Sequence, residues 1–401
     1  MTATTSVQDI LSEKGKQLSP NPRLQIRREG VISFAAGFPS PDNLPYEAVV
    51  AATQRALTSD HGEWPLQYGP AVGYAGLLDL LVEKMNRDQG IACSRENLML
   101  TSGGSQALGL MCDLFIDRGD TILSEAPTWA GAVHSFKNLG ANVVSVPVDD
   151  EGANADVMEE QLKELRAQGI QPKAFYIIPN FQNPYGSTTT LERRKKIVAL
   201  AREYNFAIFE DDAYHDLRFS GERLPTLYTL DGGEHTLYFG TFSKILSPGM
   251  RLGWIVANPA LINRLAVLKI DGSTNPFAAH VAYEFCKDGA LEARIQELIA
   301  NYKHRRDFMI GELNERMPEG VSWAVPDGGF FIWLKLPEGV DSTKVLQRCR
   351  ERNVEALSGV ANFFDGAGTS NIRLAFSYAT DEQTARGMQV LAESIQAEMG
   401  N

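Results

Sequence analysis

The chain has 401 residues, of which 44% are hydrophobic and 22% charged, and its formal net charge is −12 at pH 7. This composition is ordinary for a globular protein, and the length leaves room for two domains. The acidic balance argues against nucleic acid as a partner, because lysines and arginines supply the affinity for phosphate backbones.

The cysteines and the N-terminus indicate the compartment. Cys93, Cys112, Cys286 and Cys349 are far apart and form no C-x-x-C pair. We therefore expect neither a disulfide framework nor a metal site, and a reducing environment. The sequence contains neither an apolar secretory segment nor an apolar run long enough to span a bilayer. It predicts a soluble, cytoplasmic protein with no membrane partner.

The predicted elements fall into an arm and a long alternating region. Residues 1–30 are polar and carry the Ser-Pro-Asn-Pro stretch 19–22, which is typical of an arm. Strands are then predicted at 97–100, 121–123, 143–148, 175–178, 207–209, 237–239 and 254–256, with helices at 107–115, 131–139 and 191–204. Strands that alternate with helices predict an α/β fold, a mostly parallel sheet covered by helices on both faces. We expect a large domain over residues 46–288.

The remaining sequence predicts a smaller α+β domain over residues 289–401. Helices are expected at 290–316 and 343–352, and strands at 321–325, 330–336 and 372–376. Thr380 with Gln383 three residues later forms a capping box that announces the last helix. Residues 1–45 would form the N-terminal arm and complete part of this domain.

Polar side chains follow three predicted strands at the point where each strand ends. Asn183 comes after 175–178, Asp211 and Tyr214 after 207–209, and Lys244 after 237–239. In a doubly wound sheet, ligands bind beyond the carboxyl ends of the strands. We therefore expect these side chains to converge.

Lys244 has the sequence context of a reactive amine. It follows the apolar run 236–239, and a second apolar run begins at 252. Desolvation lowers the pKa of a lysine, which allows its neutral amine to form a Schiff base with a carbonyl group. Arg251 nearby offers a fork suited to a phosphate. The pattern favours a phosphorylated aldehyde cofactor, pyridoxal phosphate, although most lysines at strand ends are simply solvated.

Other residues have both a chemical and an ordinary interpretation. Gly104 and Ser105 open a predicted helix, whose free N–H groups suit a phosphate, but they would also serve as a plain helix start. Asp211 could keep a pyridine nitrogen protonated, or it could be a solvated strand-end acid. Trp129 could stack on a ring or pack in the core.

Eight motifs in order along the chain carry a family resemblance. They are SFAAGFPSPDNLP (33–45), LQYGPAVGYAGL (66–77), SEAPTWAGAV (124–133), PNFQNPYGSTT (179–189), EDDAYHDLRF (210–219), GTFSKILSPGMRLGW (240–254), PDGGFFIWLKLP (326–337) and NIRLAFSYAT (371–380). In these motifs the chain resembles the fold-type I pyridoxal-phosphate aminotransferases of class I/II. It is most similar to the branch that contains 2-aminoadipate (LysN-like) and kynurenine aminotransferases.

The resemblance implies a role for each matching residue around the cofactor ring. Lys244 would bind the cofactor covalently and then move the proton, and Asp211 would pair with the pyridine nitrogen. Tyr214 and Asn183 would bond the ring oxygen, and Trp129 would stack on the ring. No metal is implied.

The resemblance also implies the contacts to the phosphate and to the substrate. Gly104, Ser105, Thr241 and Arg251 would hold the phosphate, which Tyr68 of a second subunit would reach. Arg373, aided by the backbone of Gly37, would bind the α-carboxylate of the substrate, with Asn183 and Tyr68 close by. The protein is thus expected to be a homodimer with shared active sites. The Leu-Ser-Gly at 357–359 departs from the family pattern, and the arm at 21–30 looks shorter than the substrate-contacting stretch of the 2-aminoadipate enzymes, so the amino donor stays open.

Three functional hypotheses follow. The first is an aminotransferase that moves the amino group of an L-amino acid to a 2-oxo acid such as 2-oxoglutarate or pyruvate, with ping-pong kinetics. The second keeps the cofactor but uses its electron sink for β- or γ-elimination, replacement, cyclisation or oxidation. The third, a regulatory domain of the kind fused to DNA-binding modules, fits the acidic sequence poorly.

Overall fold

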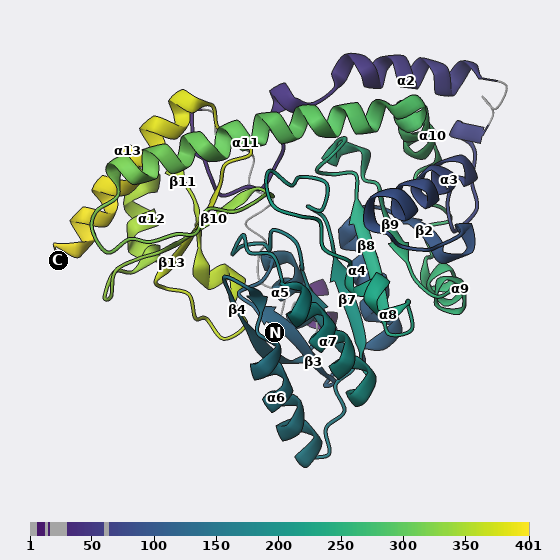
Figure 1. Ribbon diagram of the computed structural model, residues 1–401, viewed down its shortest axis with the longest axis horizontal. Coiled ribbons are helices and arrows are strands. Elements are labelled where there is room, and N and C mark those ends of the chain that lie inside the picture. The colour runs from purple at the N-terminus through teal and green to yellow at the C-terminus, as the bar shows by residue number, and fades with distance from the viewer. Residues whose placement is uncertain (1–5, 13–14, 17–29, 60–63, 401) are drawn as a thin grey trace, which may run out of the picture.

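The computed structural model describes residues 6–12, 15–16, 30–59 and 64–400. Two sheets organise this part of the chain, an eight-stranded sheet and a three-stranded sheet, and Figure 1 shows them side by side beneath the long helix α11 (Ala290–Arg316). A two-stranded parallel pairing of β1 (Ile32–Ser33) with β11 (Val354–Glu355) joins the N-terminal part of the chain to the C-terminal part. β1 thus lies beside a strand from the region in which the sequence predicts the smaller domain.

The eight-stranded sheet has the order β2-β9-β8-β7-β6-β3-β4-β5. Its strands are β2 (Leu98–Thr101), β3 (Thr121–Ala126), β4 (Asn142–Asp149), β5 (Gly152–Ala153), β6 (Ala174–Ile177), β7 (Ala207–Asp211), β8 (Thr236–Thr241) and β9 (Gly253–Val256). The central strands β4, β3, β6, β7 and β8 are parallel, whereas β9 runs antiparallel to both its neighbours, and β5 to β4. The predicted α/β fold with a mostly parallel sheet is confirmed.

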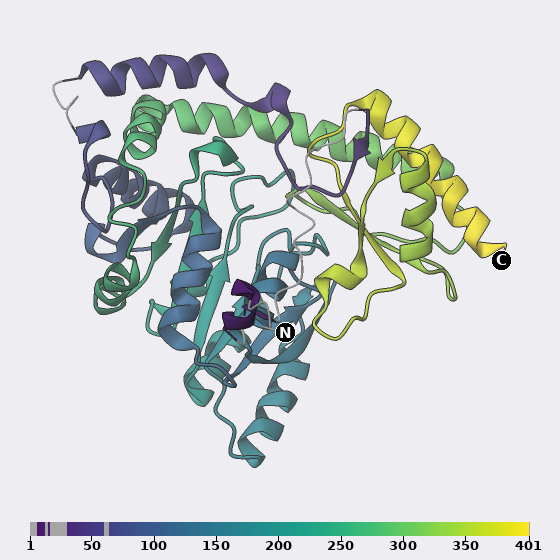
Figure 2. The same ribbon diagram turned by 180° about the vertical axis from the view of Figure 1, so that it is seen from behind.

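Helices cover both faces of this sheet, as parallel strands buried on both faces require. One face packs against α4 (Gly104–Phe115), α5 (Ala130–Leu139) and α9 (Pro259–Leu268). On the other face, the β3–β6–β7 side packs against α6 (Ala155–Ala167), α7 (Leu191–Tyr204) and α8 (Leu227–Asp231). Figure 2 shows the same layers from behind.

The three-stranded sheet has the order β10-β13-β12 and is antiparallel. Its strands are β10 (Phe331–Lys335), β12 (Leu357–Ser358) and β13 (Asn371–Ala375), accompanied by α12 (Ser342–Glu351) and α13 (Asp381–Met399). The capping box predicted at Thr380 and Gln383 is present at the start of α13. The predicted strand at 321–325 is wrong, because only Ser322 forms an isolated bridge, to Lys335.

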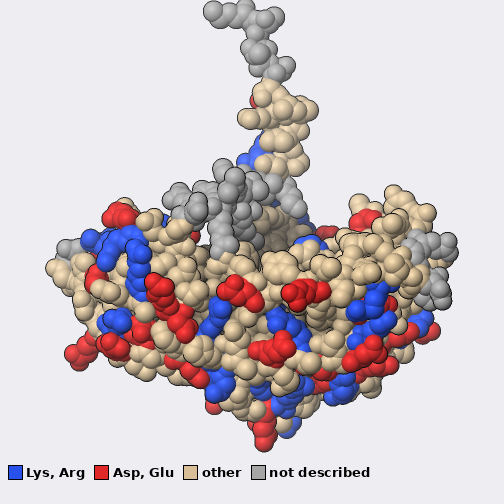
Figure 3. All heavy atoms as spheres, turned by 90° about the horizontal axis from the view of Figure 1, so that it is seen from above, with Lys and Arg blue, Asp and Glu red and all other residues tan. Residues whose placement is uncertain are grey.

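Three further helices lie near the end of α11 that is remote from the three-stranded sheet (Figure 1). They are α2 (Tyr46–Thr58), α3 (Ala75–Lys84) and α10 (Pro276–Cys286). No helix among the described residues is both long enough and apolar enough to cross a bilayer. Figure 3 shows acidic and basic side chains interspersed over the described residues of one face, without a single basic stripe there.

Candidate active site

Lys244 lies in the turn after β8, with its amine directed towards the N-terminal segment of the chain. Its Nζ donates a hydrogen bond to the carbonyl oxygen of Gly37 over 2.9 Å. The ring centroids of Tyr214 and Phe330 lie 5.9 Å and 5.5 Å from Nζ. The pKa of the Lys244 amine is lowered to about 8, chiefly by burial and then by the positive charge of Arg373; Arg251 adds to this shift and the charge of Asp211 opposes it. A sizeable neutral fraction near pH 8 makes this amine a competent nucleophile.

Asp211 ends β7 as a buried carboxylate beneath the lysine. The Tyr176 hydroxyl donates to its Oδ2 over 2.7 Å. The pKa of Asp211 is raised to about 7, chiefly by burial. The hydrogen bond from Tyr176, the backbone N–H of Ala213 and the charge of Lys244 lower it, whereas the neighbouring charge of Asp212 raises it. A positive group brought into this space would be stabilised by the carboxylate.

Arg373 approaches the same space from the smaller sheet, at the centre of β13. Its Nη1 donates to Asn183 Oδ1 over 2.9 Å, and its Nη2 donates to the carbonyl oxygen of Ala35. The guanidinium carbon lies 4.3 Å from the centroid of the Phe331 ring. Gly37 is required beside it, because a Cβ there would lie 2.5 Å from the tip of that ring. These contacts hold a planar cationic fork in a fixed orientation, which suits a carboxylate.

Tyr214 and Asn183 line the wall between Asp211 and Arg373. Tyr214 is buried and packs edge-on against Phe330 and Phe331, with ring centroids 5.5 Å and 5.8 Å away. Burial raises the pKa of the Tyr214 hydroxyl well above its usual value, while the Asn183 side chain hydrogen-bonds to it and opposes that shift. The hydroxyl therefore stays protonated and can donate.

A second, positive region lies where α4 begins. Gly103 precedes the helix with a φ of +79°, and a Cβ on it would lie 2.8 Å from Arg251 Nη2. Arg251 itself donates to the carbonyl oxygens of Pro248 and Ser102 over 3.2 Å and 3.3 Å. The N-terminus of α4 and this guanidinium thus form a cradle for an anion.

Three predicted phosphate residues surround this cradle. Gly104 is the first residue of α4 and Ser105, the second, is exposed. Thr241 ends β8, and its hydroxyl donates within its own turn, to Ser243 Oγ over 2.9 Å and to the carbonyl oxygen of Leu252 over 3.1 Å.

The structure places Trp129 at the start of α5 and Tyr68 on the surface of the chain. Trp129 is the N-cap of α5 and is partly buried against the core cluster beneath α4 and α5. The Tyr68 side chain is 81% exposed and lies beside Gly272. Within one chain, Tyr68 is therefore a surface residue.

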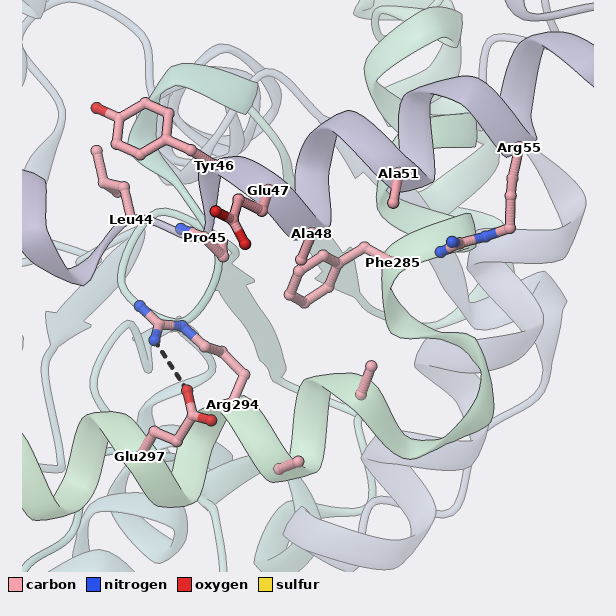
Figure 4. A pocket seen from close by; sticks show the side chains of 12 residues that line it. Leu44, Pro45, Tyr46, Glu47, Ala48, Ala51, Arg55, Phe285, Arg294 and Glu297 are labelled. Atoms are coloured by element: carbon pink, nitrogen blue, oxygen red, sulfur yellow. Dashed lines mark hydrogen bonds and ion pairs between the residues drawn. The ribbon is translucent and has the colours of Figure 1, made fainter.

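A separate hollow of about 730 Å³ lies between α2, α10 and α11. Figure 4 shows a lining of apolar side chains together with Glu47, Arg55 and the Arg294–Glu297 ion pair, in which Nη1 and Oε2 are 3.1 Å apart. None of the predicted site residues lines it.

Sequence reasoning missed several members of the site. Tyr176, Phe330 and Phe331 belong to apolar runs that predict buried strands, and nothing in those runs distinguishes a side chain that touches the site. Glu125 is fully buried, and its Oε2 accepts from the N–H of Ile178 over 2.9 Å and from Gln182 Nε2 over 3.2 Å. An acid two residues after the predicted strand 121–123 was the signal that could have revealed it.

The site fits pyridoxal phosphate at each end. The cradle between Gly103 and Arg251 suits the phosphate, the Asp211 carboxylate suits a protonated ring nitrogen, and the half-buried amine of Lys244 between them suits the aldehyde. A family model described as "Aminotransferase class I and II" matches residues 29–391. The chain belongs to this family.

Known relatives are similar to this protein along nearly the whole chain. The aromatic-amino-acid aminotransferase 1 of Thermococcus litoralis is 40% identical over 376 residues, covering 93% of this chain and 90% of the relative. The 2-aminoadipate transaminase of Thermus thermophilus is 34% identical, with coverages of 92% and 91%. The solved kynurenine aminotransferase of Pyrococcus horikoshii, in complex with PMP, has a TM-score of 0.92 and 37% identity, with 98% of each chain covered.

These findings settle the class of the protein. It is an aminotransferase that uses pyridoxal phosphate, with the fold-type I architecture. The predicted similarity to the 2-aminoadipate and kynurenine aminotransferases is confirmed. The hypothesis of elimination, replacement, cyclisation or oxidation is not favoured.

Proposed function

We propose that the protein moves the amino group of an L-amino acid to a 2-oxo acid, with 2-oxoglutarate or pyruvate as acceptor, in two half-reactions on one cofactor. The observation that carries the proposal is the position of the Lys244 amine, which donates to the carbonyl oxygen of Gly37 over 2.9 Å and lies close enough to Asp211 and Arg373 to sense both charges. An amine between a buried carboxylate and a fixed guanidinium has the groups that transamination requires. When bound, pyridoxal phosphate supplies the electron sink.

The residues of the chain would supply binding and proton transfer. Lys244 Nζ would attach the cofactor and afterwards carry the proton between the substrate Cα and the cofactor, since it is the basic group at that point of the site. Asp211 would hold the proton on the ring nitrogen, and Tyr214 and Asn183 would donate to the ring oxygen. Arg373, with the backbone of Gly37, would clamp the α-carboxylate of the substrate and so fix the direction of the Cα–H bond.

The outer residues would complete the cofactor site. Gly104, Ser105, Thr241 and Arg251 would bind the phosphate at the start of α4, and Trp129 would stack on the ring. Phe331 lies against Arg373, and Tyr214 packs edge-on against Phe331 and Phe330. This aromatic wall favours an amino donor with an apolar or aromatic side chain.

We also propose a homodimer with shared sites. Residues 64–68 and 267–270 carry large apolar side chains that stay exposed in one chain: Trp64 (53%), Leu66 (75%), Tyr68 (81%), Val267 (81%) and Ile270 (95%). The two segments are neighbours, because the N–H of Gly69 donates to Ser273 Oγ over 3.3 Å. A contiguous apolar surface of this kind is typical of an interface. Tyr68 on it would reach the phosphate of the second subunit.

We also propose two domains, an N-terminal arm and a cytoplasmic location. Residues 46–288 would form the large cofactor-binding domain and 289–401 the small domain, with 1–45 as the arm. Four free thiols support a reducing, cytoplasmic location.

A half-reaction tests the function. Addition of one L-amino acid to the holoenzyme should convert the absorbance of the cofactor from its aldehyde form to its amine form, and a 2-oxo acid should reverse the change. Release of ammonia without this reversal would contradict transamination. Repeating the first step with a panel of amino acids would identify the donor, and faster conversion by acidic than by aromatic donors would contradict the proposed preference.

A further inference from the structure

Tyr176 contacts Asp211 from the neighbouring strand and lies outside every family motif quoted above. It is 1% exposed in the middle of β6, and its hydroxyl donates to Asp211 Oδ2 over 2.7 Å. The strand register explains the contact: Tyr176 pairs with Phe209 on β7, and Asp211 lies two residues further along on the same face. The Tyr176 ring is held by Phe136, which packs edge-on with ring centroids 5.7 Å apart.

Asp211 needs such a donor because its surroundings disfavour a negative charge. Burial and the adjacent Asp212 both raise the pKa of its carboxyl group, and Glu125 on β3 is a second acid close to it. The groups that favour the charged form of Asp211 are the Tyr176 hydroxyl, the backbone N–H of Ala213 and the amine of Lys244. The charge of Asp211 in turn raises the pKa of the Tyr214 hydroxyl. Once Lys244 is joined to a cofactor, the hydrogen bonds from Tyr176 and Ala213 must supply more of the stabilisation of the charged carboxylate.

We propose that Tyr176 is a positioning residue of the cofactor site, whose hydroxyl holds the Asp211 carboxylate in the orientation and charge state that pair with a protonated ring nitrogen. The inference rests on the proposed role of Asp211. A tyrosine hydroxyl can donate one hydrogen bond, and a buried carboxylate accepts that hydrogen bond without competition from water. With Oδ2 engaged by Tyr176, the carboxylate cannot rotate freely about its last bond.

The chain offers a matched control for a purely structural role. Tyr238 on β8 is also 1% exposed, and its hydroxyl hydrogen-bonds to Asp212, the residue next to Asp211. Tyr238→Phe therefore removes the same atom from the same sheet, with the same kind of partner. Only Tyr176→Phe removes a donor from the carboxylate of the site.

The experiment compares holoenzymes of Tyr176→Phe, Tyr238→Phe, Asp211→Asn and the double variant Tyr176→Phe/Asp211→Asn. Two properties are measured: the affinity for added pyridoxal phosphate, and the pH at which the absorbance of the bound cofactor titrates. The loss of a hydrogen bond to a charged group changes a binding constant about tenfold, so Tyr176→Phe should weaken the affinity for pyridoxal phosphate about tenfold. A less firmly held ring proton makes the cofactor less electron-withdrawing, so the titration should move to higher pH.

The comparison separates positioning from structure. In the Asp211→Asn background, Tyr176→Phe should have no further effect on either property, because the carboxylate through which it acts is gone. Tyr238→Phe should leave both at the wild-type values. Equal effects of the two tyrosine variants, or an undiminished effect of Tyr176→Phe in the Asp211→Asn background, would overturn the inference.

Two further results distinguish the possible failures. If Asp211→Asn impairs retention but Tyr176→Phe does not, the inference fails and the proposed role of Asp211 stands. If Asp211→Asn changes nothing, both fail. Should Tyr176→Phe not fold, a fluorotyrosine at position 176 keeps the ring and strengthens the donor, so the titration should move to lower pH; an unmoved titration would overturn the inference.

Discussion

Arg373 Nη1 donates to Asn183 Oδ1 over 2.9 Å, across 190 positions of sequence. The bond ties β13 of the smaller sheet to the loop that follows β6 of the larger one. Because Arg373 also donates to the carbonyl oxygen of Ala35, two segments remote from β13 fix its orientation. A carboxylate that enters the site therefore meets a fork that is already aligned.

Arg373→Lys should lower kcat/KM for amino acids by about 10- to 100-fold, since a lysine cannot replace two parallel charge-assisted hydrogen bonds. Steady-state kinetics with one good donor would measure this, and cofactor absorbance should be retained. Arg305→Lys is the matched control, because Arg305 also donates to backbone carbonyl oxygens, those of Ser377 and Ala379. An equal loss in both variants would contradict the assignment of the substrate carboxylate to Arg373.

Attachment of the cofactor should depend on pH through Lys244. The pKa of its amine is lowered to about 8, so the neutral nucleophile is scarce below that pH and predominates above it. The rate at which apoenzyme incorporates pyridoxal phosphate, followed by absorbance, should rise as the pH rises through about 8. Lys244→Ala should abolish this covalent incorporation and turnover.

Arg373→Gln should move that profile to higher pH, because the positive charge of Arg373 is, after burial, the next cause of the lowered pKa. Arg305→Gln provides the comparison at a position outside the site. A profile that Arg373→Gln leaves in place would show that the charge of Arg373 does not contribute to the pKa of Lys244.

Gly103→Ala should weaken the binding of pyridoxal phosphate by about tenfold, the value of a charge-assisted contact to Arg251. The added Cβ would lie 2.8 Å from Arg251 Nη2, so the guanidinium has to leave the cradle. The control is the same substitution in an Arg251→Ala background, because Gly103 combines a φ of +79° with a ψ of 172° and an alanine there is also strained. Titration of the apoenzymes with the cofactor separates the two causes: a loss of affinity that persists without Arg251 comes from backbone strain rather than from the lost cradle.

The convergence of the site could be predicted from the sequence. Asn183, Asp211 and Lys244 each follow an apolar run, and the carboxyl ends of parallel strands meet at one edge of a sheet. The same reasoning could not predict Tyr176. Its contact depends on the register between β6 and β7, and a run that is apolar throughout contains no alternation from which a register can be read.

Long-range geometry accounts for the other differences. The hydrogen bond from Lys244 to Gly37 spans 207 positions, and no local pattern encodes it. The alternating stretch 321–325 predicts a strand, but a strand also needs a partner along its length. Ser322 pairs with Lys335 in a single isolated bridge, and Val325 is 55% exposed.

Ile270→Glu should dissociate the proposed homodimer, because Ile270 is 95% exposed in one chain and would become an unpaired buried charge in the interface. A loss of about 100-fold or more in dimer affinity is expected, measured by sedimentation. Val157→Glu on α6, where the side chain is 37% exposed, should leave the association unchanged. A wild-type protein that sediments as a monomer would contradict the shared site, and with it the role of Tyr68.

Glu125 should make the stability of the protein fall as the pH rises. Burial, its largest cause, raises the pKa of this carboxyl group to about 8, and among the described residues its Oε1 has no hydrogen-bond partner. The unfolded chain releases the proton near pH 4.5, whereas the folded chain keeps it until about 8, so the folded state binds more protons between these values. The stabilisation is therefore complete below about 4.5 and is lost as the pH rises through the folded pKa, with a slope of at most about 1.4 kcal/mol per pH unit.

Glu125→Gln removes this titration while it keeps the shape of the side chain and an acceptor for the N–H of Ile178. Urea unfolding of apoenzyme at several pH values between about 5 and 8 should show a flatter dependence for the variant, with the two proteins diverging most at the alkaline end. Glu96→Gln, at an exposed position, is the control and should follow the wild type. Parallel curves for wild type and Glu125→Gln would mean that Glu125 is ionised in the folded protein, and that the hydrogen bonds from Ile178 and Gln182 outweigh its burial.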